Sequence, residues 1–282
     1  ELADYLASYA EQFDLPVRLG TEVTRIRSKN GAYRLRTSRG TVGARAVVLA
    51  TGAYHHPKAP KFADELPDRV FSCHSSAYEN PAQLRAGDVM VVGAGNSGTQ
   101  IATEIAEAKP DSATVWLAGP DTGRLPRRLL GLDIYRYLAP TVFQLRRDSF
   151  LGRRLYEKMR TGGDPVFKTE HRKMKNAGVE RVDRITSLED GVLVDEKGGR
   201  YETDNVIWCT GFRPEFSWID PIEIGPDAYP RHERGVAEGS HGLYFVGLRW
   251  LSTGSSSLIG GVGRDAKYVA KTIREHLRRE PP

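Results

Sequence analysis

The first hydrophobic residues of the chain recur at helical spacing. Between residues 1 and 13 they fall three or four positions apart, which gathers them on one face and predicts an amphipathic helix. Short apolar runs follow and predict strands, and the pair Asn30-Gly31 predicts a hairpin turn between two of them. The helical face comprises Leu2, Tyr5, Leu6, Tyr9 and Phe13, and strands are expected at 17–19, 23–26, 33–36 and 41–42.

Two largely apolar runs predict strands that are buried on both faces. Residues 46–50 read AVVLA and end at Thr51-Gly52, and residues 205–208 read NVIW and lead to Thr210-Gly211. The surrounding segments, ARAVVLATGAYHHP and TDNVIWCTGFRPEF, align with each other. The chain therefore reads as two related units, joined by a proline-rich connector at 57–81.

The second unit opens with a strand, a glycine-rich loop and a helix. Residues 89–92 (VMVV) lead directly into the loop 93–98 (GAGNSG), and a helical pattern continues to Ala108. The next strand is expected at 113–117, and a helical pattern follows over 128–160, broken at Pro140. Short strands are expected again at 179–182, 191–194 and 200–203.

The first unit has no such opening. Gly93 lies 118 residues before Gly211, whereas only 51 residues precede Gly52. If the two units are copies, we expect the first to lack its opening strand, glycine loop and helix, with the start at Glu1 marking a missing segment. The alternative is coincidence, since buried strands that end in glycine are common in α/β proteins.

Composition changes this picture little. The 282 residues are 39% hydrophobic and 27% charged, which excludes a disordered chain, a collagen and a disulfide scaffold. Cys73 and Cys209 form neither a CxxC pair nor a metal-binding spacing, so we predict no metal site and a reducing, cytoplasmic location. No run approaches the ~20 apolar residues of a transmembrane helix.

The net charge of +5 is unevenly placed. Residues 124–175 hold 14 Lys and Arg against 5 Asp and Glu. No helix-turn-helix, zinc-finger or RNP pattern accompanies this block, so a nucleic-acid partner is not expected. Most of these charges fit a solvated helical face. The stretch 129–160 is expected to form a helical lid, with an anionic membrane surface as the alternative.

The glycine loop carries the clearest chemistry. Its glycines allow a tight turn, close approach of a pyrophosphate to the backbone, and close packing of helix on strand. The free N–H groups at the helix N-terminus then favour the anion. The predicted nucleotide-binding residues are Gly93, Ala94, Gly95, Asn96, Ser97 and Gly98.

The next strand ends without a carboxylate, and this favours NADPH over NADH. An acidic residue there would bind the ribose hydroxyls of NADH and repel a 2′-phosphate. The strand instead ends at Ala118-Gly119, and Arg124, Arg127 and Arg128 follow as candidate phosphate ligands. Asp121 could still serve as a ribose carboxylate.

Four motifs in order, GAGNSG, ATGAY, CTGFRP and GLYFVG…GGVGRDA, resemble the class B flavin-dependent monooxygenases, which include flavin-containing and YUCCA-type enzymes. The resemblance implies an α/β fold with two Rossmann-like, three-layer dinucleotide-binding domains. The NADP domain is inserted in an FAD domain that here is N-terminally incomplete. It implies FAD segments at 1–56 and 212–282, a linker at 57–86 and an NADPH-binding domain at 87–211.

The resemblance extends to the flavin and departs from the family in two places. It implies cofactor contacts at Thr51, Gly52, Gly211, Gly247, Gly260, Gly261 and Gly263. An N-terminal GxGxxG for FAD is absent. The family fingerprint FxGxxxHxxx(Y/F/W) is half present: His74 and Tyr78 fit, whereas Asp68 and Val70 stand where Phe and Gly are expected. His74 reads equally as a structural histidine or as one that couples cofactor motions.

The family mechanism uses NADPH, FAD and O2. NADPH reduces FAD, and the reduced flavin and O2 give a C4a-hydroperoxide that oxygenates a small organic substrate at nitrogen, sulfur or a carbonyl group. We therefore predict no catalytic side chain in this chain, and impaired FAD binding. The alternatives are an NADPH-dependent disulfide reductase, which the missing CxxC disfavours, and a non-catalytic NADPH-binding remnant. The oligomeric state, including a homo-oligomer, stays open.

Overall fold

The computed structural model describes residues 1–29, 31–52, 54–108, 113–120, 124–125, 128–129, 132–133, 144–162 and 166–279. The chain forms two compact units. Unit 1 comprises 1–49, 216–244 and 269–282, and unit 2 comprises 50–215 and 245–268. Both units mix helices and strands, which confirms the predicted α/β class. The assignment of segments to FAD and NADPH domains stays a prediction.

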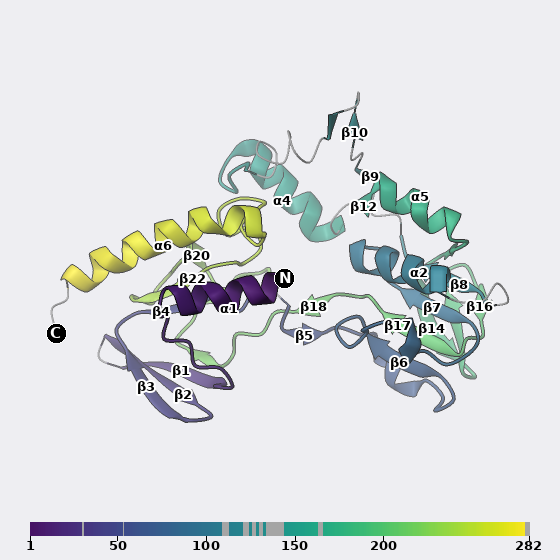
Figure 1. Cartoon of the computed structure of the whole chain (residues 1–282), viewed down its shortest axis with the longest axis horizontal. Coiled ribbons are helices and arrows are strands. Elements are labelled where there is room, and N and C mark those ends of the chain that lie inside the picture. The colour runs from purple at the N-terminus through teal and green to yellow at the C-terminus, as the bar shows by residue number, and fades with distance from the viewer. Residues whose placement is uncertain are drawn as a thin grey trace. The chain divides into compact units, whose positions relative to one another are not determined.

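Unit 2 is built on a five-stranded parallel sheet (Figure 1). The order is β13 (Glu180–Val182), β8 (Val115–Ala118), β7 (Val89–Val92), β17 (Asn205–Trp208) and β6 (Phe71–His74). All four residues of β7 and of β17 are buried, as their apolar sequences predict. The segment 57–81, which the sequence predicts to be a connector, contributes the edge strand β6, whose backbone pairs with β17.

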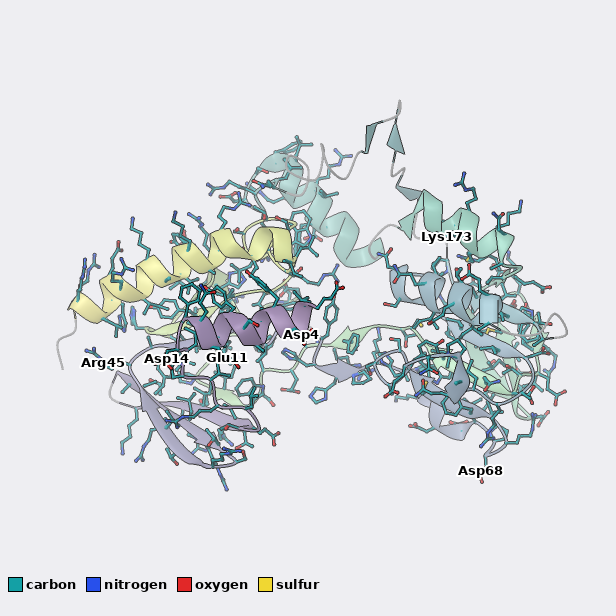
Figure 2. The ribbon with its side chains drawn as sticks, in the orientation of Figure 1. Asp4, Glu11, Asp14, Arg45, Asp68 and Lys173 are labelled. Carbon is teal, nitrogen blue, oxygen red and sulfur yellow. The ribbon has the colours of Figure 1, made fainter. Side chains whose placement is uncertain are left out.

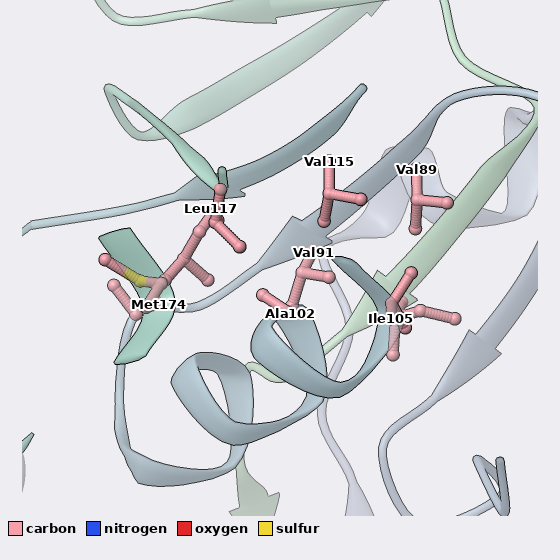
Figure 3. Close-up of a cluster of buried hydrophobic side chains, with 10 residues drawn as sticks. Val89, Val91, Ala102, Ile105, Val115, Leu117 and Met174 are labelled. Carbon is pink, nitrogen blue, oxygen red and sulfur yellow. The ribbon is translucent and has the colours of Figure 1, made fainter. Parts of the chain in front are cut away.

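One face of this sheet is covered by α2 (Asn96–Ala108) and α5 (Lys168–Asn176). Figure 3 shows the core on this side, where Val91 and Leu117 from the strands meet Ala102 from α2 and Met174 from α5. Both helices bury apolar residues against the sheet, as a helix with one apolar stripe must. This packing fixes the start of α2 at the carboxyl end of β7.

The other face of the sheet carries an antiparallel meander. It consists of β14 (Ile185–Glu189), β15 (Val192–Asp195) and β16 (Arg200–Tyr201), and the short 3-10 helix η1 (Lys61–Glu65) lies beside it. A second apolar cluster fills this side and includes Met90, Val92, Ala118, Leu193, Val206 and Trp208. Strand residues thus alternate between the two clusters, as expected for a sheet buried on both faces.

The segment between β8 and α5 differs from its prediction. Helix α4 spans Phe150–Gly162, but Arg128–Leu129 and Leu132–Asp133 form the antiparallel pair β10 and β11. The predicted helix over 128–133 is therefore wrong. Gly131 in the sequence disfavours a helix by about 1 kcal/mol, and strand pairing overrides the remaining propensity. Two further short strands, β9 (Arg124–Leu125) and β12 (Val166–Phe167), pair in parallel.

Unit 1 contains two four-stranded sheets. The first has the order β19 (Ile219–Asp220), β1 (Val23–Lys29), β2 (Ala32–Thr37) and β3 (Gly40–Ala44), and β1 and β2 are the predicted antiparallel pair. Asn30 of the predicted turn lies outside the described residues. The second sheet comprises β20 (His232–Glu233), β21 (Val236–Ala237), β22 (Leu243–Phe245) and β4 (Val47–Leu49).

The remaining elements are α6 (Ile259–Arg279), the 3-10 helix η2 (Pro81–Gln83) and the antiparallel pair β5 (His56–Pro57) and β18 (Phe212–Arg213). The phenol of Tyr33 is 1% exposed and donates to the carbonyl of His241 at 2.7 Å, which ties the two sheets of unit 1 together. Among the described residues, no helix is long and apolar enough to cross a membrane.

Helix α1 (Leu2–Gln12) confirms the predicted N-terminal helix but not a buried face. None of its residues is buried, and Leu2, Tyr5 and Leu6 are 56–62% exposed. Asp4 and Glu11 project from it in Figure 2. The strand expected at 17–19 is absent from these described residues, because this backbone pairs with no neighbouring strand.

Candidate functional site

The glycine loop connects β7 to α2 and leaves no room for side chains at two positions. Gly93 has φ of +115°, and a Cβ there would lie 2.7 Å from the carbonyl carbon of Cys209. A Cβ at Gly98 would lie 3.0 Å from the carbonyl carbon of Gly93 and closer still to its oxygen. Gly98 therefore allows the helix to start against the strand, and Gly93 allows the strand end to lie against β17.

The same loop is open at its middle glycine. A Cβ at Gly95 would meet no atom within 4 Å, so the space above the backbone is unfilled by protein. The first helical hydrogen bond runs from the Thr99 N–H to the Gly95 carbonyl at 3.0 Å. The preceding N–H groups lie in the first turn, which has no intrahelical acceptors. This combination fits an anion such as a pyrophosphate.

The carboxyl end of β8 lies beside the loop. Gly119 has φ of +128°, and a Cβ there would lie 3.3 Å from the Ala94 nitrogen. No acidic side chain belongs to this strand end, Trp116 to Gly119. A residue that sequence reasoning missed reaches it: Arg181 on β13 donates from Nη2 to the Gly119 carbonyl at 2.6 Å. No local motif marks Arg181, because only the pairing of β13 with β8 brings it there.

The arginines predicted from sequence are only partly described. The backbone of Arg124 pairs with Val166, and that of Arg128 pairs with Asp133. Their side chains, and the whole of Arg127 and Asp121, lie outside the described residues. Their role in binding a 2′-phosphate stays a prediction.

The second Thr-Gly motif lies where β17 ends. The Gly211 carbonyl accepts from the Lys58 N–H at 2.9 Å and from Nε2 of His74 at 2.9 Å. The Thr210 hydroxyl donates to the Lys58 carbonyl. These bonds join the segment after β17 to the segment after β5. The two segments that align in the sequence therefore lie side by side, with β5 and β18 paired through their backbones.

His74 is held in one tautomer. The Ser76 N–H lies 3.2 Å from Nδ1, which must therefore accept, so Nε2 carries the proton and donates to Gly211. The ring also packs edge-on against Phe212, with centroids 4.9 Å apart. Burial lowers the pKa of His74, and the hydrogen bond to Gly211 opposes this in part. A neutral imidazole thus fixes the end of β17.

The first Thr-Gly motif has a similar support. Gly52 has φ of +72°, and its carbonyl accepts from Nε2 of His55 at 3.2 Å. The Glu215 N–H donates to Nδ1 of the same ring at 2.9 Å. A Cβ at Gly52 or at Gly211 would meet nothing within 4 Å, so both positions are open. Glycine is therefore needed at these two positions for its positive φ, +72° at Gly52 and +81° at Gly211, and not because a side chain would clash.

The closing segment 247–263 consists of a loop rich in hydroxyl groups, residues 247–258, followed by the first residues of α6. Gly247, Gly260 and Gly263 are open positions, whereas a Cβ at Gly261 would lie 2.5 Å from the Cβ of Ser255. Of the predicted flavin-contact glycines in this segment, Gly261 is thus needed for packing of the loop, and the other three leave space. Their flavin contacts stay predictions.

Asp265 anchors this loop and was not anticipated from the sequence. The side chain is 1% exposed, and one carboxylate oxygen accepts from the Ser252 hydroxyl. The Ser256 hydroxyl in turn accepts the N–H groups of Ser252 and Thr253, each at 3.0 Å. A buried carboxylate is costly unless it is hydrogen-bonded. Asp265 therefore ties the loop to the first turns of α6.

The basic segment 144–162 packs on this closing loop. The Arg147 N–H donates to the Ser252 carbonyl at 2.8 Å, and the rings of Tyr156 and Trp250 lie 5.9 Å apart, edge to face. The guanidinium of Arg147 lies 4.5 Å from the centre of the Tyr156 ring. The described part of the segment thus covers the loop, which lies in the same unit.

Neither of the two thiols is activated as a thiolate nucleophile. Cys73 lies on β6 and Cys209 follows β17. Burial raises the pKa of Cys209 to about 12, with a smaller contribution from Cys73, and burial also raises the pKa of Cys73. Both thiols are therefore protonated at neutral pH. Among the described residues, no group of His, Cys, Asp and Glu could hold a metal ion.

Comparisons with known proteins place the chain among oxidoreductases. A family model described as pyridine nucleotide-disulphide oxidoreductase matches residues 1–124. An "Uncharacterized oxidoreductase CzcO-like" of Geobacillus kaustophilus is 37% identical over 98% of this chain and 78% of its own length. A "Probable indole-3-pyruvate monooxygenase YUCCA9" of Arabidopsis thaliana is 24% identical over 99% of this chain and 73% of its own length.

A solved structure matches nearly the whole chain. The "Flavin-containing monooxygenase from Stenotrophomonas maltophilia" is 23% identical, with a TM-score of 0.73, over 97% of this chain and 76% of its own length. This likeness confirms the predicted α/β fold.

Proposed function

The chain belongs to the CzcO-like oxidoreductases, and from that premise we propose that it is a flavin-dependent monooxygenase, which uses NADPH and FAD to insert one oxygen atom of O2 into a small organic substrate. The oxygen is delivered to a nitrogen or sulfur atom or to a carbonyl group. The observation that carries the nicotinamide half is the glycine loop, closed at Gly93 and Gly98 and open at Gly95.

The chain's own residues bind and orient the cofactors. The N–H groups at the start of α2 hold the pyrophosphate of NADPH, and the neutral end of β8 admits a phosphorylated ribose. The open backbone at Gly52, Gly211, Gly260 and Gly263 gives the room that a planar ring system needs. Bound FAD supplies hydride acceptance and reaction with O2.

Two features favour a monooxygenase over a disulfide reductase. Reduction of a disulfide by a dithiol enzyme needs a pair of reactive thiols. Cys73 and Cys209 form no CxxC pair, and burial raises the pKa of each thiol. We therefore infer that bound FAD and NADPH, and not these thiols, carry out the redox reaction.

The test is oxidation of NADPH by the purified protein in air and under anaerobic conditions, each with and without added FAD. We expect oxidation in air that depends on FAD, consumes O2 and yields hydrogen peroxide when no substrate is present. Oxidation under anaerobic conditions that depends on an added disulfide would instead assign a reductase. Binding of NADPH without oxidation, even with FAD, would assign a non-catalytic protein.

A further inference from the structure

An exposed aromatic ring lies beside the two Thr-Gly motifs of unit 2. Tyr54 follows the first of these motifs in the sequence, and the residue is 69% exposed. We propose that the Tyr54 ring, supported by Phe212, packs against the nicotinamide ring of NADPH. This inference rests on the proposed use of NADPH and names a residue that holds the reactive half of that cofactor.

The order of the strands gives the direction in which a dinucleotide would run. The chain passes from β7 to β8 and then to β13 on one side of the sheet, and afterwards crosses to β17 on the other side of β7. A dinucleotide binds across the carboxyl ends of the strands at such a reversal, with the pyrophosphate at the glycine loop and the ribose next to the adenine at the end of the second strand. The second strand here is β8, so the nicotinamide half extends toward β17 and β6.

The aromatic rings lie on that side. Phe212 comes shortly after β17, and His74 is the last residue of β6. The Phe212 ring packs edge to face against both neighbours, with its centroid 5.2 Å from that of Tyr54 and 4.9 Å from that of His74. His74 itself donates to the Gly211 carbonyl at 2.9 Å. The Tyr54 ring therefore lies against a support that is hydrogen-bonded to the end of the sheet.

The segment that leads to Phe212 also contacts the glycine loop. A Cβ at Gly93 would lie 2.7 Å from the carbonyl carbon of Cys209 and 3.3 Å from the Thr210 nitrogen. Strands β7 and β17 pair in parallel, so their carboxyl ends lie side by side. The rings and the loop belong to the same compact unit, unit 2.

The surroundings of Tyr54 leave space for a planar ring. A Cβ at Gly52 or at Gly211 would meet nothing within 4 Å, and the exposure of Tyr54 shows that its contact with Phe212 covers only a small part of the residue. Aromatic rings attract one another in offset or edge-to-face arrangements. The nicotinamide of NADP⁺ is also cationic, and a cation is attracted to the face of a tyrosine ring.

The experiment measures binding by isothermal titration calorimetry, which needs no turnover. The ligands are NADP⁺, 2′-phospho-ADP-ribose, which lacks only the nicotinamide ring, and FAD. We compare the unaltered chain with Tyr54→Ala, Tyr54→Phe and the control Tyr5→Ala. Tyr5 lies on α1, is 62% exposed and likewise contacts one other ring, that of Tyr9, at 6.4 Å between centroids. Thermal melting of each variant checks that the fold is retained.

We expect Tyr54→Ala to raise the Kd for NADP⁺ by about 3- to 10-fold, the range for loss of one aromatic contact. The Kd for 2′-phospho-ADP-ribose rises by less than about 2-fold, because this ligand has no ring to pack against Tyr54. Tyr54→Phe keeps the ring and binds both ligands as the unaltered chain does. Tyr5→Ala leaves both constants unchanged.

Each of four results would overturn the inference. Equal losses for NADP⁺ and 2′-phospho-ADP-ribose in Tyr54→Ala would mean that the change acts on the backbone and not on the nicotinamide contact. Unchanged NADP⁺ binding with weakened FAD binding would assign the ring to the flavin, and unchanged binding of both would leave it no role in holding a cofactor. A loss in Tyr54→Phe as large as in Tyr54→Ala would assign the contact to the hydroxyl.

Failure of the proposed function gives a different result. If the unaltered chain binds neither NADP⁺ nor 2′-phospho-ADP-ribose, the proposed use of NADPH fails together with the inference. The four results above, obtained with an unaltered chain that binds NADP⁺, remove only the role of Tyr54.

Discussion

The two glycines of the loop that differ most in their surroundings give the sharpest prediction. At Gly98 an added Cβ would lie 3.0 Å from the carbonyl carbon of Gly93 and closer to its oxygen, and 3.3 Å from the Cβ of Cys209. Carbon atoms in contact normally lie about 3.5–4.0 Å apart. Gly98→Ala therefore requires α2 or the end of β7 to move by at least about 0.5 Å, because the obstructing atoms belong to backbone.

The cost of that movement follows from overpacking. Inserting one methyl group into a filled site typically costs about 1–3 kcal/mol, and a backbone obstacle places Gly98→Ala at the upper end. The same movement shifts the N–H groups that hold the pyrophosphate. We therefore expect Gly98→Ala to lower the midpoint of urea unfolding and to weaken NADP⁺ binding by at least about 10-fold.

Gly95→Ala is the matched control, since a Cβ there meets nothing within 4 Å. We expect its unfolding free energy to equal or exceed that of the unaltered chain by up to about 1 kcal/mol, because alanine restricts the unfolded state. Its NADP⁺ binding nevertheless falls at least about 10-fold, because the methyl group occupies the place of the pyrophosphate. Unchanged stability in Gly98→Ala, or unchanged binding in Gly95→Ala, would refute the reasoning.

Three further predictions concern buried groups. Because burial lowers the pKa of His74 below the ~6.5 of an unfolded histidine, the unfolded chain binds the proton first as the pH falls. The contribution of His74 to stability is thus present above about pH 6.5 and is lost as the pH falls through the folded pKa. We expect His74→Gln to flatten the plot of the free energy of unfolding in urea against pH between pH 5 and 7; an unchanged slope of this plot contradicts the prediction. With a pKa of about 12, only about one Cys209 thiol in ten thousand is ionised at pH 8. We therefore expect iodoacetamide to alkylate Cys209 far more slowly in the folded protein than in urea; equal rates would contradict the prediction. Ser252→Ala leaves a carboxylate oxygen of Asp265 without its donor and should lower the free energy of unfolding in urea by about 1–3 kcal/mol. Ser187→Ala removes an exposed hydrogen bond to Glu189 and should cost little; equal losses in the two variants would mean that the buried bond adds nothing.

Much of unit 2 was predictable because its signals are local. The apolar runs at β7 and β17 and the glycine loop between β7 and α2 each follow from neighbouring residues. The strand β6 was missed, because its sequence FSCH has no apolar pattern and its pairing partner lies more than 130 residues away. The helix expected at 128–133 failed for a different reason, since β10 pairs with β11, which is close to it in sequence, and this pairing decides the backbone there.

The candidate site divides in the same way. Gly93, Gly95 and Gly98 were identified from their spacing, because a turn between strand and helix is a local event. Arg181 and Asp265 were not, because each acts on a partner distant in sequence or hidden within a loop: Arg181 reaches Gly119, and Asp265 holds Ser252. Charge and hydroxyl content alone do not reveal which of many polar residues are buried or bonded.

The sequence by itself determined the α/β class, the positions of β7 and β17 along the chain and the position of the glycine loop, since each depends on periodicity or on glycine at a turn. Only the tertiary structure decided that the connector supplies an edge strand, that His74 and Lys58 converge on the Gly211 carbonyl, and that the guanidinium of Arg181 on β13 reaches the end of β8. The physical reason is that strand register and burial bring together residues that no local spacing relates.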